Sequence, residues 1–222
     1  MPTASYILFG LATVWCIAWV ARASRGWIMP LLLMASGAVH WLLADQGYYR
    51  NVVSFPPPQM ALLVPLIIGM VLLFALPGGR RWLLKADIKA LTALHILRIP
   101  VEIVLHEAYL KGHVPKAMTY SGHNFDILTG LSAVFLVVWM VAGNGPGRRI
   151  LLVWNLVGTV LLGIVVVTAV LSIPSSIQRL SFDQPNILVV SPPWILLPAM
   201  LVPAVQWGHA VALFQLFRSR TD

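Results

Sequence analysis

The stretch RILLVWNLVGTVLLGIVVVTAVL, residues 149–171, decides the fold class of this chain. A helix needs about 20 predominantly apolar residues to cross the hydrocarbon core of a bilayer, and this stretch has no charged residue after its first. Six other runs of comparable length lie at residues 5–22, 27–44, 60–77, 87–108, 125–143 and 193–216. We therefore predict an all-α, polytopic membrane protein in which residues 1–222 form a single bundle of seven transmembrane helices.

The composition points to the same class. Hydrophobic residues make up 59% of the 222 residues and charged residues only 10%, whereas about a quarter of residues are charged in soluble domains. The net charge of +8 would suggest nucleic acid in a soluble protein, but here the basic residues lie in short clusters between apolar runs. We therefore expect the lipid bilayer, and no nucleic acid, as partner. The single cysteine, Cys16, excludes an intrachain disulfide and a cysteine-based metal cage.

The basic clusters also predict an orientation, because the cytoplasmic connections of membrane proteins carry an excess of Lys and Arg. Ten of the 15 such residues belong to the connections after the first, third and fifth runs and to the tail: Arg22, Arg25, Arg80, Arg81, Lys85, Lys89, Arg148, Arg149, Arg218 and Arg220. The opposite side holds four, namely Arg50, Lys111, Lys116 and Arg179, and Arg98 lies inside a run. We therefore predict an N-terminus outside and a C-terminus in the cytoplasm.

The connections on the two sides also differ in length. The basic ones are short and rich in Gly and Arg, whereas the opposite ones are longer and rich in Pro, Asn and aromatic residues: YYRNVVSFPPPQ, KGHVPKAMTYSGHN and SIPSSIQRLSFDQPNILVVSPP. Long connections carry binding and catalytic residues more often than short turns do. We therefore expect the working end of the protein to be the outer one.

One run is unusually polar: HILRIPVEIVLHE, residues 95–107. His95, Arg98, Glu102 and His106 recur at helical spacing, so they form one stripe on the helix. Arg98 and Glu102 are four residues apart and are expected to pair, because a buried arginine is costly without a partner or a water-filled cavity. Pro100 is expected to kink the helix. The alternative is a purely structural ion pair that packs this helix against its neighbours.

Polar residues in other runs are expected near the same depth. His209, in the last run, lies level with His95, and His40 lies nearer the outer end, close in depth to Glu102. Asn124 and Asp126 begin the run 125–143, where either a helix cap or a site residue would fit. Asn155 and Gln206 are further polar groups that a lipid-facing helix would avoid, so together these residues indicate a polar interior.

Several specific chemistries fit poorly. A retinal protein needs a lysine in the last helix, and residues 193–216 contain none. Ser36 and His40 resemble part of the motif of seven-helix zinc hydrolases, but His209 lacks the second histidine of their His-x-x-x-His pair. The histidines near the outer surface match no closed ligand pattern, and bis-histidine haem between His95 and His209 has only matched depth in its favour. We therefore predict neither a metal nor another cofactor.

Four stretches carry a wider resemblance: LHILRIPVEIVL, GHNFDILTGLSA, FDQPN and WILLPAMLVPAVQWGHAVAL. Together they resemble a group of uncharacterised seven-helix integral membrane proteins of bacteria, from about residue 90 onward. The resemblance implies a multi-pass protein of the bacterial inner membrane. It also implies a set of matched positions, which are His95, Arg98, Glu102, Asn124, Asp126, Gln184, Asn186 and His209.

These residues support three hypotheses for function. In the first, the protein is a membrane-embedded acid-base enzyme (an isomerase, cyclase or hydrolase) acting on a lipophilic small molecule. Its expected catalytic residues are Glu102, Asp126, His95 and His209, and its expected substrate-binding residues are Arg98, Asn124, His40, Gln184 and Asn186. In the second, it is a proton-linked transporter or a ligand-binding protein. In the third, it is a structural or accessory subunit, and a homo-oligomer is compatible with each hypothesis.

Overall fold

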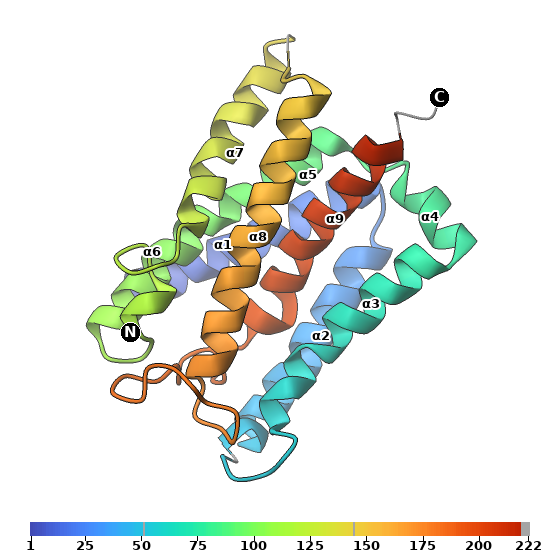
Figure 1. Ribbon diagram of the computed structural model, residues 1–222. Coiled ribbons are helices and arrows are strands. Elements are labelled where there is room, and N and C mark those ends of the chain that lie inside the picture. The colour runs from blue at the N-terminus through green and yellow to red at the C-terminus, as the bar shows by residue number, and fades with distance from the viewer. Residues whose placement is uncertain (51, 144, 219–222) are drawn as a thin grey trace.

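The computed structural model describes residues 1–50, 52–143 and 145–218, the side chains of residues 64–66 and 72 excepted, and within them the chain is all-α (Figure 1). The α-helices are α1 (Thr3–Ser24), α2 (Ile28–Asp45), α3 (Val64–Ala75), α4 (Pro77–Leu83), α5 (Ile88–Leu94), α6 (Arg98–Leu110), α7 (Asp126–Val141), α8 (Arg148–Ser172) and α9 (Val202–Arg218). Short 3-10 turns are η1 (Tyr48–Arg50), η2 (Pro58–Leu62), η3 (His95–Leu97) and η4 (Lys116–Met118), and η5 (Leu197–Leu201) is a π-helical segment.

Five helical segments are long and apolar enough to cross a membrane: α1, α2, Pro58–Ala75, α8 and Leu197–Arg218. They indicate a multi-pass membrane protein, and the predicted all-α class is confirmed. The other two expected spans differ from the prediction, one in length and one in continuity. The run 125–143 forms the 16-residue helix α7, and the run 87–108 is divided into α5, η3 and α6.

The division of that run has a local cause. Residues His95–Leu97 form a 3-10 turn, and α6 begins directly after it at Arg98. Pro100 therefore lies in the first turn of α6, where its missing N–H leaves no helical hydrogen bond unmade. The predicted proline kink is thus a 3-10 turn that precedes the proline.

Connections from distant parts of the sequence meet at one end of the bundle, which we call the basic end. The backbone N–H of Asp87 donates to the carbonyl of Ala23 at 3.0 Å, which joins the end of α1 to the start of α5. Arg148 Nε donates to the carbonyl of Leu216 at 2.7 Å, which joins the start of α8 to the end of α9. The connections that the sequence assigned to the cytoplasm therefore lie together, although Arg220 lies outside the described residues.

The longer connections meet at the opposite end, which we call the long-loop end. Ser176 Oγ donates to the carbonyl of Ser54 at 2.9 Å. The backbone N–H of Ile187 donates to the carbonyl of His113 at 3.1 Å. The chain therefore runs alternately between the two ends, as the sequence predicted, while its orientation in the membrane stays a prediction.

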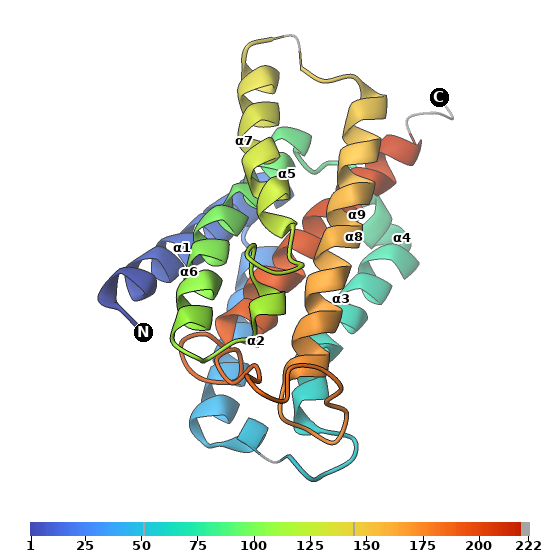
Figure 2. The ribbon, with the colours of Figure 1, turned by 60° about the vertical axis from the view of Figure 1, so that its left-hand side comes forward.

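The largest buried cluster joins α1, α5, α6 and α9, with Cys16 and Val20 of α1 fully buried in it. Figures 1 and 2 show α7 and α8 as an antiparallel pair at one margin of the bundle and α3 with α4 at the other. Large apolar side chains on α7 and α8, including Phe135 and Val153, point away from the protein and are more than half exposed. Such faces are expected where lipid surrounds a helix.

Candidate functional site

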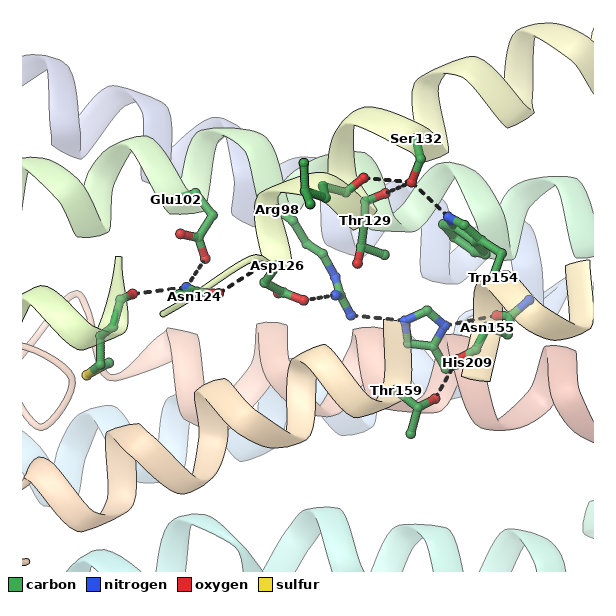
Figure 3. A network of polar contacts seen from close by, with 12 residues as sticks. Arg98, Glu102, Asn124, Asp126, Thr129, Ser132, Trp154, Asn155, Thr159 and His209 are labelled. Carbon is green, nitrogen blue, oxygen red and sulfur yellow. Dashed lines mark hydrogen bonds and ion pairs between the residues drawn. The ribbon is translucent and has the colours of Figure 1, made fainter. Parts of the chain in front are cut away.

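Arg98, the first residue of α6, forms a salt bridge with Asp126, the first residue of α7, and both side chains are buried (Figure 3). The predicted pairing of Arg98 with Glu102 is therefore wrong. Both residues lie on one helix face as expected, but the guanidinium reaches across to the neighbouring helix. Within the described residues this is the one salt bridge.

A second nitrogen of the same guanidinium faces His209 of α9. Arg98 Nη2 lies 3.1 Å from His209 Nε2, and His209 Nδ1 lies 2.9 Å from Asn155 Oδ1 on α8. Asn155 Nδ2 in turn donates to the carbonyl of Leu151 at 2.8 Å. Four helices are thus connected through one row of polar side chains, visible from Asp126 to Asn155 in Figure 3.

The row has one consistent direction. Arginine carries donors only, so His209 Nε2 must accept from Arg98. The ring then carries its proton on Nδ1, which donates to Asn155 Oδ1, and the Asn155 amide is oriented by its own bond to Leu151. His209 is therefore neutral in this arrangement, and it accepts a hydrogen bond from Arg98.

His95 lies directly beside His209, so the prediction that they share one depth is confirmed. Their ring centroids are 3.9 Å apart with planes inclined by 24°, and Trp154 packs edge-on against His95 with a centroid distance of 5.2 Å. Face-to-face stacking leaves no space for an iron between the two rings, so the geometry does not fit bis-histidine haem. Within the described residues, no group of three or more His, Cys, Asp or Glu side chains could hold a metal.

Two glycines permit this packing. A Cβ atom on Gly208 would lie 3.1 Å from His95 Nε2, and one on Gly158 would overlap the His209 ring, with its Nε2 only 2.6 Å away. The absent side chains let the imidazole rings fill the space between α5, α8 and α9. The contact of each glycine with a histidine ring was not predicted from the sequence, because the two partners are distant along the chain.

The second carboxylate of the site, Glu102, is held differently. Asn124 Nδ2 donates to Glu102 Oε1 at 2.5 Å and to the carbonyl of Met118 at 2.9 Å. Asn124 Oδ1 accepts from the backbone N–H of Asp126 at 2.9 Å. Both N–H groups of the Asn124 amide donate and its oxygen accepts. These three hydrogen bonds fix the orientation of the amide, so Glu102 Oε1 must be an acceptor.

Several polar atoms of this region lack a protein partner. Glu102 Oε2, Arg98 Nε and both ring nitrogens of His95 are buried and form no hydrogen bond within the described residues. Buried polar groups in native proteins are normally paired with protein, water or ligand. Of these three residues, Arg98 and Glu102 line a cavity, whereas His95 does not.

A cavity of about 90 Å³ lies beside Arg98, Glu102 and Asp126. Its other walls are almost entirely apolar side chains, contributed mainly by α8 and by the segment Leu197–Arg218. Gln59 and Met60 of η2 line it from the long-loop end. The cavity thus combines hydrocarbon walls with one charged wall, and the contribution of Gln59 was not predicted from the sequence.

The structure brings Arg98, Glu102, Asn124, Asp126, His95 and His209 together and places the other expected site residues elsewhere. His40 lies against Tyr49, with 2.5 Å between Nδ1 and the hydroxyl, and does not line the cavity. Burial and the neighbouring Tyr48 raise the pKa of Tyr49 to about 12, so its hydroxyl stays protonated and donates to His40.

Gln184 and Asn186 fasten the last long connection. Gln184 Nε2 donates to the carbonyls of Tyr109 and Val114 at 2.9 and 2.6 Å, and Asn186 Nδ2 donates to Ala169 at 3.3 Å. Both residues therefore tie the connection to the ends of α6 and α8. Their positions support the shape of the long-loop end and lie outside the cavity lining.

Together these features define a helical, multi-pass membrane protein with a cavity that has one charged wall. The chain belongs to the family described as Domain of unknown function (DUF8737), which matches residues 55–217 and so contains the whole polar site. Comparison with curated proteins and with solved structures found no match. The family assignment therefore carries no activity, and the site must be interpreted from its own geometry.

Proposed function

We propose that this protein is a membrane-embedded acid-base enzyme that acts on a lipophilic small molecule, with Glu102 as the group that transfers the proton. One observation carries the proposal: an apolar cavity is lined by Glu102, whose Oε2 is buried and has no hydrogen-bond partner within the described residues. The apolar walls suit a substrate that partitions into lipid. A single buried carboxyl group can take a proton at one position of such a molecule and return it at another.

Asn124 determines which oxygen of Glu102 reacts. Because Glu102 Oε1 accepts from the oriented Asn124 amide, a proton on the carboxyl group resides on Oε2. When ionised, the same Oε2 accepts a proton or a hydrogen bond from the ligand. Asn124 is thus a positioning residue, and isomerisation or cyclisation by proton transfer suits this arrangement best.

Two further polar residues, Asp126 and His209, contribute to the site by holding Arg98. Asp126 neutralises the guanidinium and His209 orients it, which leaves Arg98 Nε as a donor for an oxygen of the ligand. Pairing is needed because an unpaired charge inside a membrane protein is costly. In this proposal Asp126 and His209 support the site, and Glu102 and Arg98 contact the substrate.

The proposal includes the orientation taken from the basic residues. All seven helical segments cross the bacterial inner membrane, with the basic end in the cytoplasm and the long-loop end outside. The cavity is lined by Gln59, Ile177 and Val189 at or near the long-loop end. Its substrate would therefore enter from the outer leaflet or the outer surface.

The test compares the protein with its Glu102→Gln variant, both purified from the native host in mild detergent. Lipophilic molecules extracted from each sample are identified by mass spectrometry. We expect both proteins to retain the same substrate and only the unsubstituted protein to contain its converted form. Glu107→Gln, on the same helix but outside the cavity lining, is the matched control. Equal conversion by Glu102→Gln and the unsubstituted protein would refute the proposal.

A transporter is the second candidate, and a different observation favours it. Leu197, Pro198 and Leu201 of the π-helical segment line the cavity. Interrupted helices at a binding site are typical of transporters, where they permit access from alternate sides, and π-helical segments often occur at functional sites. A cysteine placed at Val166, which lines the cavity, would react with membrane-impermeant reagents from both membrane faces in a transporter. Reaction from one face only would favour the enzyme.

A further inference from the structure

A second, larger hollow of about 690 Å³ lies between α2, α3, α4 and α9. Ala199, Pro203 and Trp207 line it from the last segment, whereas Pro198, Val202 and Val205 of the same segment line the cavity beside Glu102. The two sets recur at helical spacing on different faces. The larger hollow, which we call the α2–α3 crevice, is therefore separate from the proposed active site.

The walls of the crevice suit hydrocarbon. Leu32, Leu73 and Met70 are among the side chains that line it. The one hydroxyl in the lining, that of Ser36, is already engaged, because it donates to the carbonyl of Ala199 at 3.0 Å. Since the walls offer so few polar groups, a water-filled crevice would be unfavourable and an apolar chain is the better occupant.

One buried donor in the lining has no partner. Trp207 is only 1% exposed, lines the crevice, and its Nε1 forms no hydrogen bond within the described residues. Its ring lies 6.1 Å from that of Trp82, which lines the crevice from α4. Buried tryptophan N–H groups usually find an acceptor, so an occupant that is apolar but carries an acceptor oxygen fits better than a pure hydrocarbon.

Two exposed basic residues lie close to the crevice along α4. Gly78, Gly79 and Trp82 line the crevice, and Arg80 and Arg81 lie between them in the sequence, where their long side chains can reach its edge. Neither arginine takes part in a salt bridge within the described residues. Arg80 Nε donates to the carbonyl of Phe74 at 2.5 Å, which leaves its terminal nitrogens available.

We propose that the α2–α3 crevice is a binding site for an anionic glycerophospholipid. An acyl chain lies between α2 and α3, an ester carbonyl offers the acceptor that Trp207 lacks, and Arg80 and Arg81 bind the phosphate. Basic pockets between membrane helices are suited to anionic head groups, and arginine is the side chain best shaped to bind phosphate. The lipid fills the gap between α2 and α3 and stabilises the position of the α3 and α4 pair.

The test is native mass spectrometry of the full chain in detergent, titrated with phosphatidylglycerol or with phosphatidylcholine of identical acyl chains. We expect one phosphatidylglycerol to bind, about tenfold more tightly than phosphatidylcholine. The double variant Arg80→Ala/Arg81→Ala is expected to lose this preference. Equal affinity of the unsubstituted protein for the two lipids would overturn the proposal.

A crevice-filling variant tests the position of the acyl chain. Gly69 lines the crevice, and a Cβ atom there meets nothing within 4 Å, so Gly69→Phe fills the space without a backbone clash. Gly163→Phe is the matched control, because Gly163 of α8 is equally free and lies away from the crevice. We expect phosphatidylglycerol binding to weaken about tenfold in the first variant only. Unchanged phosphatidylglycerol binding in Gly69→Phe would overturn the lipid proposal. So would a dimer that this variant dissociates, because the occupant of the crevice would then be a second copy of the chain.

Discussion

Asp126 and Glu102 line the same wall of one cavity, but the structure uses the two carboxylates in opposite ways. Asp126 is neutralised by a salt bridge to Arg98. Glu102 receives a single hydrogen bond from the Asn124 amide, and its second oxygen has no partner within the described residues. One carboxylate is therefore fully paired between two helices, and the other keeps one buried oxygen without a protein partner.

The difference follows from the direction in which the Arg98 guanidinium points. Its two terminal nitrogens are directed to Asp126 and to His209. Glu102 lies one helical turn further along α6 and instead accepts from Asn124. A spacing of four residues permits an ion pair but does not require one. A partner on a neighbouring helix can satisfy the arginine better.

The largest expected effect on stability comes from breaking the salt bridge between Arg98 and Asp126. Arg98→Leu leaves the Asp126 carboxylate buried without a cation, which should lower the free energy of unfolding by about 3–5 kcal/mol. The measurement is denaturant unfolding in detergent micelles, followed by circular dichroism. The double variant Arg98→Leu/Asp126→Leu should recover most of the loss, because no uncompensated charge remains. If the double variant is as unstable as the single one, the salt bridge is not the cause.

Gly158→Ala is expected to disturb the packing of His209, which holds Arg98. The added methyl group would overlap the His209 ring, and such overpacking typically costs about 1–3 kcal/mol. Unfolding of Gly158→Ala and of Gly163→Ala should be compared, because the second variant adds its methyl group where nothing lies within 4 Å. Equal stability of the two variants would show that His209 moves freely and does not fix α8 against α9.

A smaller effect on stability is expected from the hydrogen bond between Trp154 and Ser132. Trp154 Nε1 donates to Ser132 Oγ at 2.8 Å and so connects α8 to α7. Trp154→Phe keeps an aromatic ring against His95 but removes the donor, so a loss of about 1 kcal/mol in unfolding free energy is expected. Trp139→Phe on α7 is the control for loss of an indole ring. A similar change in both variants would indicate that the hydrogen bond contributes little.

The smallest effect on stability is expected where the effect on function is largest. Glu102→Gln keeps an oxygen to accept from Asn124, so the unfolding free energy should change by less than about 1 kcal/mol. Glu102→Leu removes that acceptor and should cost more, about 1–3 kcal/mol, because a buried amide donor of Asn124 loses its partner. A large destabilisation by Glu102→Gln would assign Glu102 the same structural role as Asp126.

The sequence was sufficient for the class of protein and for most of the polar site, because both depend on local patterns. The length of apolar runs predicts membrane helices, and helical spacing placed His95, Arg98 and Glu102 on one face. Comparing depths along the runs placed His209 level with His95, which the stacked rings confirm.

Features that depend on rotation and tertiary contact could not be predicted in this way. Asp126 is 28 residues from Arg98, so their salt bridge has no local signature. Depth alone placed His40 near Glu102, but depth does not determine the direction in which a helix faces, and His40 contacts Tyr49 instead. The 3-10 turn at His95–Leu97 likewise depends on how α5 and α6 pack against their neighbours.

The direction of the hydrogen bonds from Arg98 to the Leu151 carbonyl has a consequence for proton transfer. A proton relay requires every member to accept a proton on one side and release another on the other side. Arg98 carries donors only and keeps its proton, so a proton that reaches Glu102 cannot pass through Arg98 to His209. The row of polar side chains therefore joins four helices without offering a path for protons from Glu102 to Asn155.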